Sequence, residues 1–241
     1  MEVNADDSLS QPYFMILLLV GIAGAMDAVD FREYGVFTAN QAGNLVLVWE
    51  RLTTDSALAL LSLFSLVGCA VGVMIVILVR LWFPYFVKPS GSRTLLYVAA
   101  FLLMVTALAG RNLAEPLREL TAGELEIGTA AWWAAVASLS SSAMALAVMG
   151  TIFIMVGAHR AQVIAGTGPF VDSVRFAVAS IFTRNTNWTR QFKAIVWFPI
   201  AWTFGAAFAS LVPVDRGVIA VFCALTICGI AIASRRVGSL A

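Results

Sequence analysis

The chain has 241 residues, of which 61% are apolar and 12% are charged, and its formal net charge at pH 7 is +1. Together with a mean hydropathy of +0.90, this composition excludes an ordinary soluble domain and indicates an integral membrane protein. The chain contains no basic run, which argues against a nucleic-acid partner. Because a span needs about 20 apolar residues, there is room for about six spans and for no separate soluble domain.

Apolar runs bounded by aromatic and charged residues predict the spans in chain order. Residues 1–12 contain three acidic residues and no Lys or Arg, which favours an uncleaved tail over a signal peptide. A polar, acidic segment at 111–128 is expected to lie at the membrane surface, and Pro199 predicts a kink in the fifth span. The six spans are expected near residues 13–31, 56–83, 94–110, 129–158, 192–212 and 216–234.

The stretch from Gly21 to Trp49 departs from this simple pattern. It begins as the second half of an apolar helix, passes through a polar and glycine-containing run, and becomes apolar again without a hydrophilic loop. Lipid offers no hydrogen-bond partners to broken backbone, so such a break persists only against protein or a wet cavity. The stretch is therefore predicted to line a site.

The second half of the chain repeats this arrangement. Residues 24–43 and residues 150–168 each contain a helix end and a glycine-containing break, and each is followed by an apolar stretch and two spans. A three-span unit is odd, so its second copy must enter from the opposite face, as in inverted repeats whose breaks meet near the bilayer centre. The expected fold class is an all-α membrane bundle of two inverted three-span repeats, at 1–128 and 129–241, each with a broken or re-entrant segment after its first helix.

Small and hydroxyl-bearing residues predict how the spans pack. Gly68 and Gly72 in the second span, and Gly205 and Ala209 in the fifth, have the spacing of four that lets two helix backbones approach closely. The run of serines within 138–142 is expected to hydrogen-bond between helices rather than to attack a substrate.

The distribution of Lys and Arg predicts the orientation of the chain. With six spans, one face of the membrane holds ten of these residues and the other face holds five. Because basic residues favour the cytoplasmic side, both termini are expected in the cytoplasm.

Two acids of the first span are candidates for chemistry. Asp27 lies about 21 Å along the helix from Tyr13, inside the hydrocarbon or near its outer edge. A carboxylate at that depth is costly and by default marks a proton or cation site; the alternatives are an interfacial acid or a carboxylate that caps a neighbouring helix. Asp30 is nearer to water and is interpreted as a solvated acid paired with Arg32.

The two glycine-containing breaks supply the remaining candidates for binding a solute. The positive end of a half-helix directed at the membrane interior attracts an anion or the oxygen of a polar solute, and Asn44 is expected to cap the short helix that runs to Trp49. In the second half, Pro169 suits the first turn of a helix. The alternative is that both breaks are ordinary caps at the interface. The predicted substrate-binding residues are Asp27, Asn40, Gln41, Gly43, Asn44, Thr167 and Gly168.

The sequence contains no pattern typical of a catalytic or metal site. His159 is the only histidine, and the three cysteines, Cys69, Cys223 and Cys228, lie within spans without the paired spacing of zinc or redox sites. Nucleophile elbows, phosphate loops and dinucleotide signatures are absent from the sequence. We therefore expect no catalytic residues, no metal and no cofactor.

The first break resembles the signature of the YoaK-like family of bacterial membrane proteins, a family of unknown function. The resemblance is carried by Gly24-Ala-Met-Asp27-Ala, Gly35-Val-Phe and Ala39-Asn40-Gln-Ala-Gly43-Asn44, and more weakly by Met149-Gly150 and Thr167-Gly168. The chain departs from the family at Ala42, where Thr is usual, and at Ile152 and Phe153, where a Gln-Asn pair is usual. The resemblance implies a six-span protein of the bacterial inner (plasma) membrane and suggests small-molecule transport.

Three functional hypotheses follow from these patterns. The first is a small-solute transporter or channel with a central polar site formed by the two helix breaks, whose partners are the lipid bilayer and an unknown small polar solute. The alternative is a non-transporting accessory or structural subunit, in a homo-oligomer or a larger membrane complex, which the altered second signature motivates. A membrane enzyme is the third hypothesis, but the sequence offers no catalytic constellation for it and we do not expect enzymatic activity.

Overall fold

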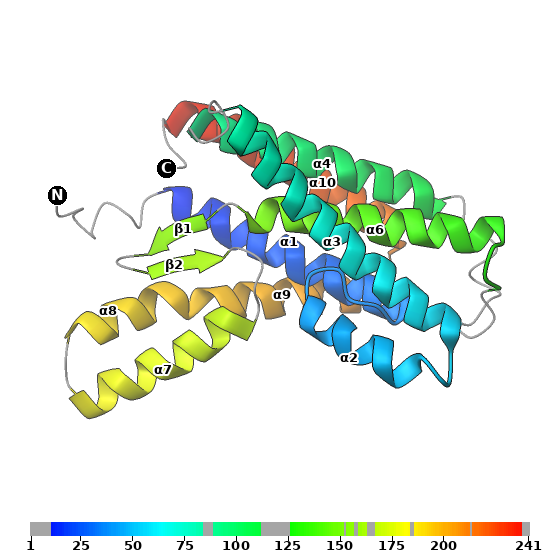
Figure 1. Ribbon diagram of the computed structural model, residues 1–241. Coiled ribbons are helices and arrows are strands. Elements are labelled where there is room, and N and C mark those ends of the chain that lie inside the picture. The colour runs from blue at the N-terminus through cyan, green and yellow to red at the C-terminus, as the bar shows by residue number, and fades with distance from the viewer. Residues whose placement is uncertain are drawn as a thin grey trace.

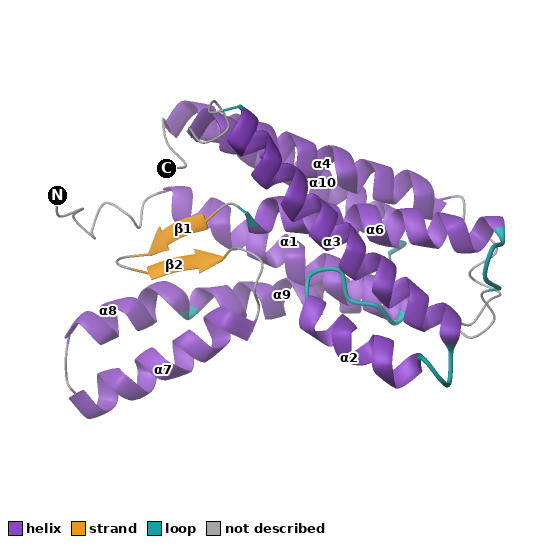
Figure 2. Cartoon of the chain, in the orientation of Figure 1, coloured by secondary structure: helices purple, strands orange, loops and turns teal. Residues whose placement is uncertain are grey.

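The computed structural model describes residues 11–83, 89–111, 126–151, 153–156, 159–162, 167–183, 186–212 and 214–237. Within these residues the chain is almost entirely helical (Figure 2). Six of its helical segments are long and apolar enough to cross a membrane. The predictions of a membrane protein, a helical fold and about six spans are therefore confirmed.

The described residues of the first half form three long helices and one short one. The short helix α2 follows the first long helix and precedes the second (Figure 1). The bounds are α1 Gln11–Tyr34, α2 Gln41–Arg51, α3 Ser56–Trp82 and α4 Pro89–Arg111. The predicted segment at 111–128 lies mostly outside the described residues.

The described residues of the second half form helices and a short hairpin of strands. The hairpin is antiparallel, and Phe153 pairs with Gln162 in its register. The bounds are α6 Ala130–Gly150, β1 Phe153–Val156, β2 His159–Gln162, α7 Thr167–Thr183, α8 Thr186–Ile195, α9 Trp197–Leu211 and α10 Arg216–Val237.

The fourth span is shorter than its expected extent to residue 158. The α6 helix ends at Gly150, and the N–H of Thr151 closes its last turn on the carbonyl of Ala147. Glycine is common where helices end. The next segment, Phe-Ile-Met-Val at 153–156, has the β-branched and aromatic composition that favours a strand. An apolar run alone does not distinguish these two structures, which is why the sequence prediction was wrong here.

The fifth span is longer than expected and is interrupted once. It comprises α8 and α9 and begins at Thr186. The interruption falls at Val196, one turn before Pro199. Because proline has no N–H to donate to the carbonyl four residues earlier, Pro199 accounts for the irregularity at that point.

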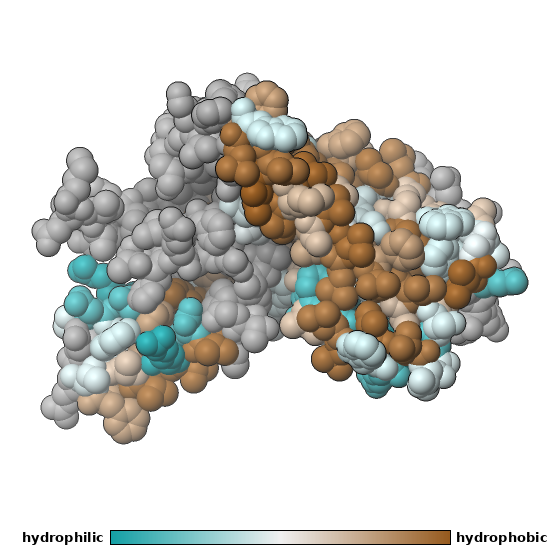
Figure 3. All heavy atoms as spheres, in the orientation of Figure 1, coloured by the Kyte–Doolittle hydropathy of each residue, from teal (hydrophilic) through white to brown (hydrophobic). Residues whose placement is uncertain are grey.

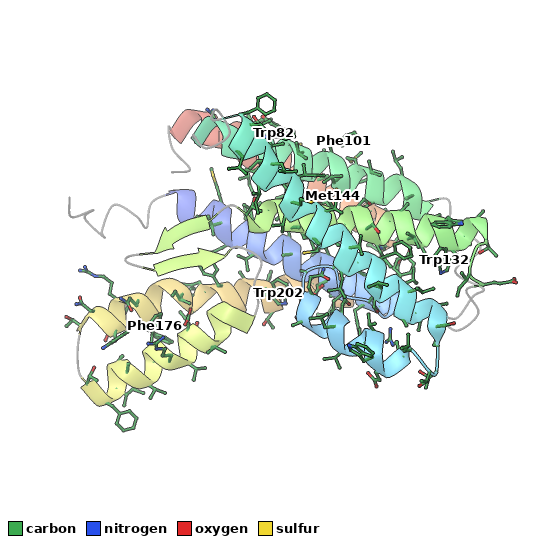
Figure 4. All side chains as sticks on the ribbon, in the orientation of Figure 1. Trp82, Phe101, Trp132, Met144, Phe176 and Trp202 are labelled. Atoms are coloured by element: carbon green, nitrogen blue, oxygen red, sulfur yellow. The ribbon has the colours of Figure 1, made fainter. Side chains whose placement is uncertain are left out.

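Glycine residues set two close helix crossings, one between α1 and α9 and one between α3 and α6. A Cβ atom added to Gly205 would lie 1.9 Å from the carbonyl oxygen of Gly21, and one added to Gly24 would lie 2.2 Å from that of Trp202. At the other crossing, Gly68 faces the backbone of Ser140 and Gly72 that of Met144. Trp202 and Met144 mark the two crossings in Figure 4.

These contacts confirm the predicted close packing at Gly68, Gly72 and Gly205. The fourth member of the predicted set, Ala209, is fully buried. Small side chains at a crossing let two helix backbones approach closely. In lipid, where burying apolar side chains gives little driving force, this close packing holds the helices together.

The remaining long helices complete a bundle whose outer side is apolar. The α4 helix packs against both α6 and α10, and α10 also packs against α1. Exposed apolar side chains, among them Leu63, Val67, Met74 and Phe101, lie on α3 and α4, and Figure 3 shows apolar residues along α3. This surface fits a protein surrounded by lipid tails.

The short helices α2 and α7 both begin near the middle of the molecule as seen in Figure 1. From there α2 runs towards the end of the bundle at which α1 ends, and α7 runs towards the opposite end. The start of α1 and the end of α10 lie at the same end of the bundle, as an even number of spans requires.

Candidate functional site

The carboxylate of Asp27 holds the backbone that leads into α2. Its Oδ1 atom accepts hydrogen bonds from the N–H groups of Thr38, Ala39 and Asn40, at 2.8, 2.7 and 3.3 Å. Asp27 is seven residues before the last residue of α1, Tyr34, which corresponds to about 10 Å along the helix. The start of α2 therefore lies beside the body of α1 and not beyond its end.

Asn44 fixes the same break from the other side. Its Oδ1 accepts from the N–H of Phe37 at 3.0 Å, and its Nδ2 donates to the carbonyl of Phe37 at 2.5 Å and to Ser65 Oγ at 3.1 Å. Ser65 in turn donates to the carbonyl of Phe37 at 2.7 Å. Ser65 is nine residues from the start of α3 at Ser56, or roughly 13 Å along that helix, so two helices place the break at a similar depth.

The expectation that Asn44 caps α2 is wrong. Asn40 occupies the N-cap position, and its side chain makes no capping hydrogen bond. Asn44 lies one turn inside α2 and is fully buried, because both hydrogen-bonding groups of its amide are used by the backbone of Phe37. The Asn44 amide hydrogen-bonds to the N–H and to the C=O of Phe37, as the backbone of a neighbouring β-strand would.

Gln41 and Gly43 complete the compact turn before α2. Gln41 Nε2 donates to the carbonyl of Thr38 at 2.7 Å. A Cβ atom on Gly43 would lie 2.8 Å from the ring of Phe37, so this position has room only for hydrogen. The turn also needs Gly35, whose φ of 64° favours glycine and whose carbonyl accepts from Arg51 Nη1 at 2.8 Å.

The structure thus brings together the five predicted site residues of the first half. The N–H groups at the start of a helix attract negative charge, and here they bind the chain's own Asp27 carboxylate. This is the capping alternative for Asp27. The outward side of α2 is apolar and exposed at Leu45, Val46 and Trp49, so the helix presents hydrocarbon on one side and the polar break on the other.

A second polar cluster lies beside the break, and it centres on an ion pair between Asp30 and Arg216. Arg216 is the first residue of α10, and its Nε donates to Asp30 Oδ1. The other carboxylate oxygen accepts from Thr38 Oγ1 at 2.5 Å and from Ser142 Oγ at 2.9 Å. Asp30 is 0% exposed and Arg216 is 2% exposed, so the charges neutralise each other out of contact with solvent.

The interpretation of Asp30 as a solvated acid paired with Arg32 is therefore wrong. Arg32 points outward and donates to the carbonyls of Ala209 and Val214, at 3.1 and 3.3 Å. Among the described residues, the carboxylate that pairs with it is that of Glu33, at 4.0 Å. Successive helical residues point in different directions, and Asp30 faces the bundle interior while Arg32 faces its periphery.

Hydroxyl groups extend this cluster to α4 and α6. Ser138 accepts from Arg216 Nη1 and donates to the carbonyl of Thr106 at 3.0 Å. The hydroxyls of Thr106 and Ser141 lie 2.7 Å apart. The prediction that the serines hydrogen-bond between helices is confirmed, and the cluster joins four helices: α1, α4, α6 and α10.

Tyr34, the last residue of α1, closes one side of the ion pair. The Arg216 guanidinium carbon lies 5.0 Å from the centre of its ring, within the range of a cation–π contact. The side chain is 2% exposed, yet its hydroxyl has no hydrogen-bond partner among the described residues. The buried Nε1 of Trp132, on α6, likewise has no hydrogen-bond partner among the described residues.

Sequence reasoning missed Arg216 and its pairing with Asp30. Arg216 begins an apolar span, a position that is typical of residues at the membrane interface. Its partner is 186 residues earlier in the chain, and no local pattern joins them. The available signal was the scarcity of charge: in a chain with so few charged residues, two opposite charges at span ends are candidates to meet inside the bundle.

The predicted second-half residues are less fully described. The α7 helix begins at Thr167, so Gly168 and Pro169 fall in its first turn, where proline is favoured. The side chains of this segment lie outside the described residues, and so do those of β2, including His159.

The chemistry that these clusters offer is polar binding inside an apolar bundle. The groups are carboxylates, a guanidinium, amides and hydroxyls, which hold and orient polar solutes by hydrogen bonds and charge. Within the described residues, no group of three or more His, Cys, Asp or Glu side chains is placed to hold a metal ion.

Comparison with known proteins places the chain in a family. No curated protein and no solved structure matches it. The model of a family described as protein of unknown function (DUF1275) matches residues 15–234, which is most of the chain and includes both polar clusters. The chain therefore belongs to this family of proteins of unknown function, the YoaK-like family that the motifs of the first break resemble.

Proposed function

We propose that this protein carries small polar solutes across the bacterial inner membrane, through a polar centre formed by the break at 35–44 and the Asp30–Arg216 pair. The observation that carries the proposal is the position of the break, which Asp27 and Ser65 hold about 10 Å or more inside two helices. Broken backbone at that depth is tolerated only where it faces protein or lines a path for water. Buried opposite charges in a span are costly and by default functional.

The packing pattern supports two inverted three-span repeats. Such repeats match α1 to α6, α3 to α9 and α4 to α10. Exchanging the matched helices turns the contact of α1 with α9 into the contact of α6 with α3, and it leaves the contact between α4 and α10 unchanged. The same exchange matches α2 to α7. Both helices start near the centre and run in opposite directions (Figure 1). In transporters with this symmetry, half-helices that start at the bilayer centre form the solute site. We place both termini in the cytoplasm, where the excess of Lys and Arg predicts them.

The present arrangement corresponds to a closed state under this proposal. The charges of Asp30 and Arg216 satisfy each other, and the backbone of the break is bound by Asp27 and Asn44. Passage of a solute requires these two sets of contacts to part, and both link α1 to elements that follow it in the chain. Movement of α10 against α1 would open the ion pair without breaking any backbone hydrogen bond within a helix.

Flux measurements on purified protein in liposomes test the proposal. A panel of labelled amino acids, sugars, polyols and inorganic ions should contain solutes that enter faster than into protein-free liposomes. Asp27→Asn keeps an acceptor oxygen for the break but removes its charge, and we expect flux to fall about tenfold or more, as for loss of one strong charged interaction. Absence of flux for the whole panel contradicts the proposal.

Asp55→Asn is the matched control. Asp55 caps α3 by accepting from the N–H of Leu58 at 3.0 Å, so it also binds backbone N–H groups but lies at the end of a span. This variant should keep wild-type flux per folded molecule. An equal loss of flux in both variants would show that Asp27 acts only through folding.

The second candidate is an accessory subunit of a larger membrane complex. It is favoured by the same closure of the polar clusters, because a centre whose groups satisfy one another also suits a purely structural role. Purification in a gentle detergent should then recover a stoichiometric partner. Flux by the chain alone decides in favour of transport.

A further inference from the structure

The ion pair of Asp30 and Arg216, between α1, α6 and α10, carries no net charge and is surrounded by hydroxyl groups. The neighbouring Asp27 carboxylate is bound separately by the N–H groups of the break, and Glu33, which is within electrostatic reach of Arg216, is partly exposed. We propose that the transported solute is a small zwitterion with one ammonium and one carboxylate group, and that it binds by replacing each partner of the Asp30–Arg216 pair. This inference rests on the proposed transport function and names its substrate class.

Charge balance is the first argument for a zwitterion. Separating Asp30 from Arg216 exposes two opposite charges in a site removed from water, and an unpaired buried charge is strongly unfavourable. A solute with only one charge compensates one of them and leaves the other unpaired. A zwitterion compensates both, so two new ion pairs replace the one that separates and no buried charge is left unpaired.

The atoms around Asp30 suit an ammonium group. Thr38 and Ser142 both donate their hydroxyl hydrogens to Asp30 Oδ2 in the closed state. A hydroxyl oxygen also accepts hydrogen bonds. An ammonium group in place of the guanidinium would have three donors to satisfy, and the carboxylate with these two hydroxyls supplies three acceptors.

The atoms around Arg216 suit a carboxylate group. A guanidinium has five N–H donors in a planar fork that matches a carboxylate. Arg216 directs them at one oxygen of Asp30 and at Ser138. The ring of Tyr34 lies against the guanidinium, and its buried hydroxyl has no partner among the described residues. A solute carboxylate on Arg216 would give that hydroxyl an acceptor.

Three solutes built on alanine, together with one longer zwitterion, test the charge requirement. The probes are alanine, N-acetylalanine and alaninamide, which at pH 7 are a zwitterion, an anion and a cation, and 4-aminobutyrate, a zwitterion with a longer spacing. Binding is measured by thermal stabilisation of the detergent-purified protein, and flux by uptake into liposomes. We expect at least tenfold tighter binding and faster flux for one or both zwitterions than for the singly charged compounds.

The outcomes separate the inference from the proposed function. Preference for the anion, for the cation or for an uncharged sugar or polyol contradicts the inference that the solute is a zwitterion. The proposal of transport is unaffected by that result. Failure of every solute in both assays removes the transport proposal, and this inference falls with it.

Tyr34→Phe gives a second, sharper test, because it removes only the unpartnered hydroxyl. Among the described residues the hydroxyl makes no hydrogen bond of ordinary geometry, although it lies beside the Ser138 side chain. Thermal stability without solute should therefore change little, whereas zwitterion affinity should fall about tenfold, the usual effect of losing a hydrogen bond to a charged group. Trp132→Phe is the control: it removes another unpartnered buried donor, on a ring that packs against Phe64 and Trp133. An unchanged affinity in Tyr34→Phe, or an equal loss in both variants, contradicts the proposed carboxylate contact.

Discussion

The first helices of the two halves, α1 and α6, differ in what they contribute to the polar centre. The α1 helix carries both acids, Asp27 and Asp30, and the break that follows it folds back against them. The α6 helix contributes uncharged groups to this centre, namely hydroxyls and the backbone carbonyl of Ser138, and beyond its last residue, Gly150, the described chain forms a hairpin. One half therefore supplies the negative charge and the other supplies hydroxyls together with Arg216.

The difference shows that the two halves do not form two equivalent sites. Asp30 lies in the first half, and its carboxylate accepts hydrogen bonds from Ser142 and Arg216, which lie in the second half. The centre is thus shared across the halves, and each half alone would leave a buried polar group without a partner. This dependence acts together with the glycine crossings of α1 with α9 and of α3 with α6 to specify how the halves fit together, since lipid competes for less specific apolar contacts.

The largest expected effect comes from removing the charge that crosses this boundary. Arg216→Met leaves the Asp30 carboxylate buried and unpaired, which costs about 4 kcal/mol of unfolding free energy. Arg32→Met removes an arginine that lies at the periphery and should cost less than about 1 kcal/mol. Denaturant unfolding in detergent, followed by circular dichroism, measures both.

Adding Asp30→Asn to Arg216→Met should recover part of the lost stability, because the double variant no longer buries a lone charge. If the double variant is as unstable as the sum of the two single variants, Asp30 and Arg216 are not coupled in the folded protein.

The next largest effect compares the two helix crossings. Gly205→Ala places a methyl group against the carbonyl oxygen of Gly21, and we expect a cost of about 3 kcal/mol because the α1 and α9 backbones must separate. Gly72→Ala at the crossing of α3 and α6 meets its closest atom at 2.9 Å instead of 1.9 Å and should cost less. Both are measured as shifts in thermal unfolding.

Gly229→Ala is the control for this series. An added Cβ at Gly229 would meet nothing within 4 Å, so alanine should leave stability unchanged or raise it by up to about 1 kcal/mol through helix propensity. Equal costs for Gly205→Ala and Gly229→Ala would contradict the close crossing.

A smaller effect is expected at the break. Asn44→Ala removes the amide that binds both polar groups of Phe37 and should cost about 2 kcal/mol, since a buried N–H and C=O lose a partner. Thr54→Ala, which removes an exposed and long hydrogen bond to Glu50, should change stability by less than about 0.5 kcal/mol. Thermal unfolding in detergent distinguishes the two results.

The spans and the first break could be predicted from the sequence because their signals are local. Apolar length predicts a span, and the polar run from Gly35 to Asn44 between two apolar stretches predicts a break at depth. The roles within the break were less predictable, because whether Asn44 caps a helix or pairs with Phe37 depends on a turn of a few residues. The end of the fourth span was misjudged since an apolar run suits a helix and a strand equally well.

The centre itself was only half predictable for a different reason. Asp27 and the serines of α6 could be found from their unusual setting in apolar spans. The pairing of Asp30 with Arg216 depends on how α10 lies against α1, which is a property of the assembled bundle. Periodicity along one helix carries no information about which charge from a distant span will meet it.

The depth of the break in the bilayer is the central claim, and thiol labelling tests it most directly. In a variant that lacks the native cysteines, Ala42→Cys on α2 and Thr53→Cys after α2 both lie at exposed positions, and they differ only in expected depth. A water-soluble maleimide should label Thr53→Cys at least ten times faster than Ala42→Cys in liposomes, whereas detergent-denatured protein should label equally at both. Equal labelling rates in the intact membrane would place the break at the surface and contradict the account.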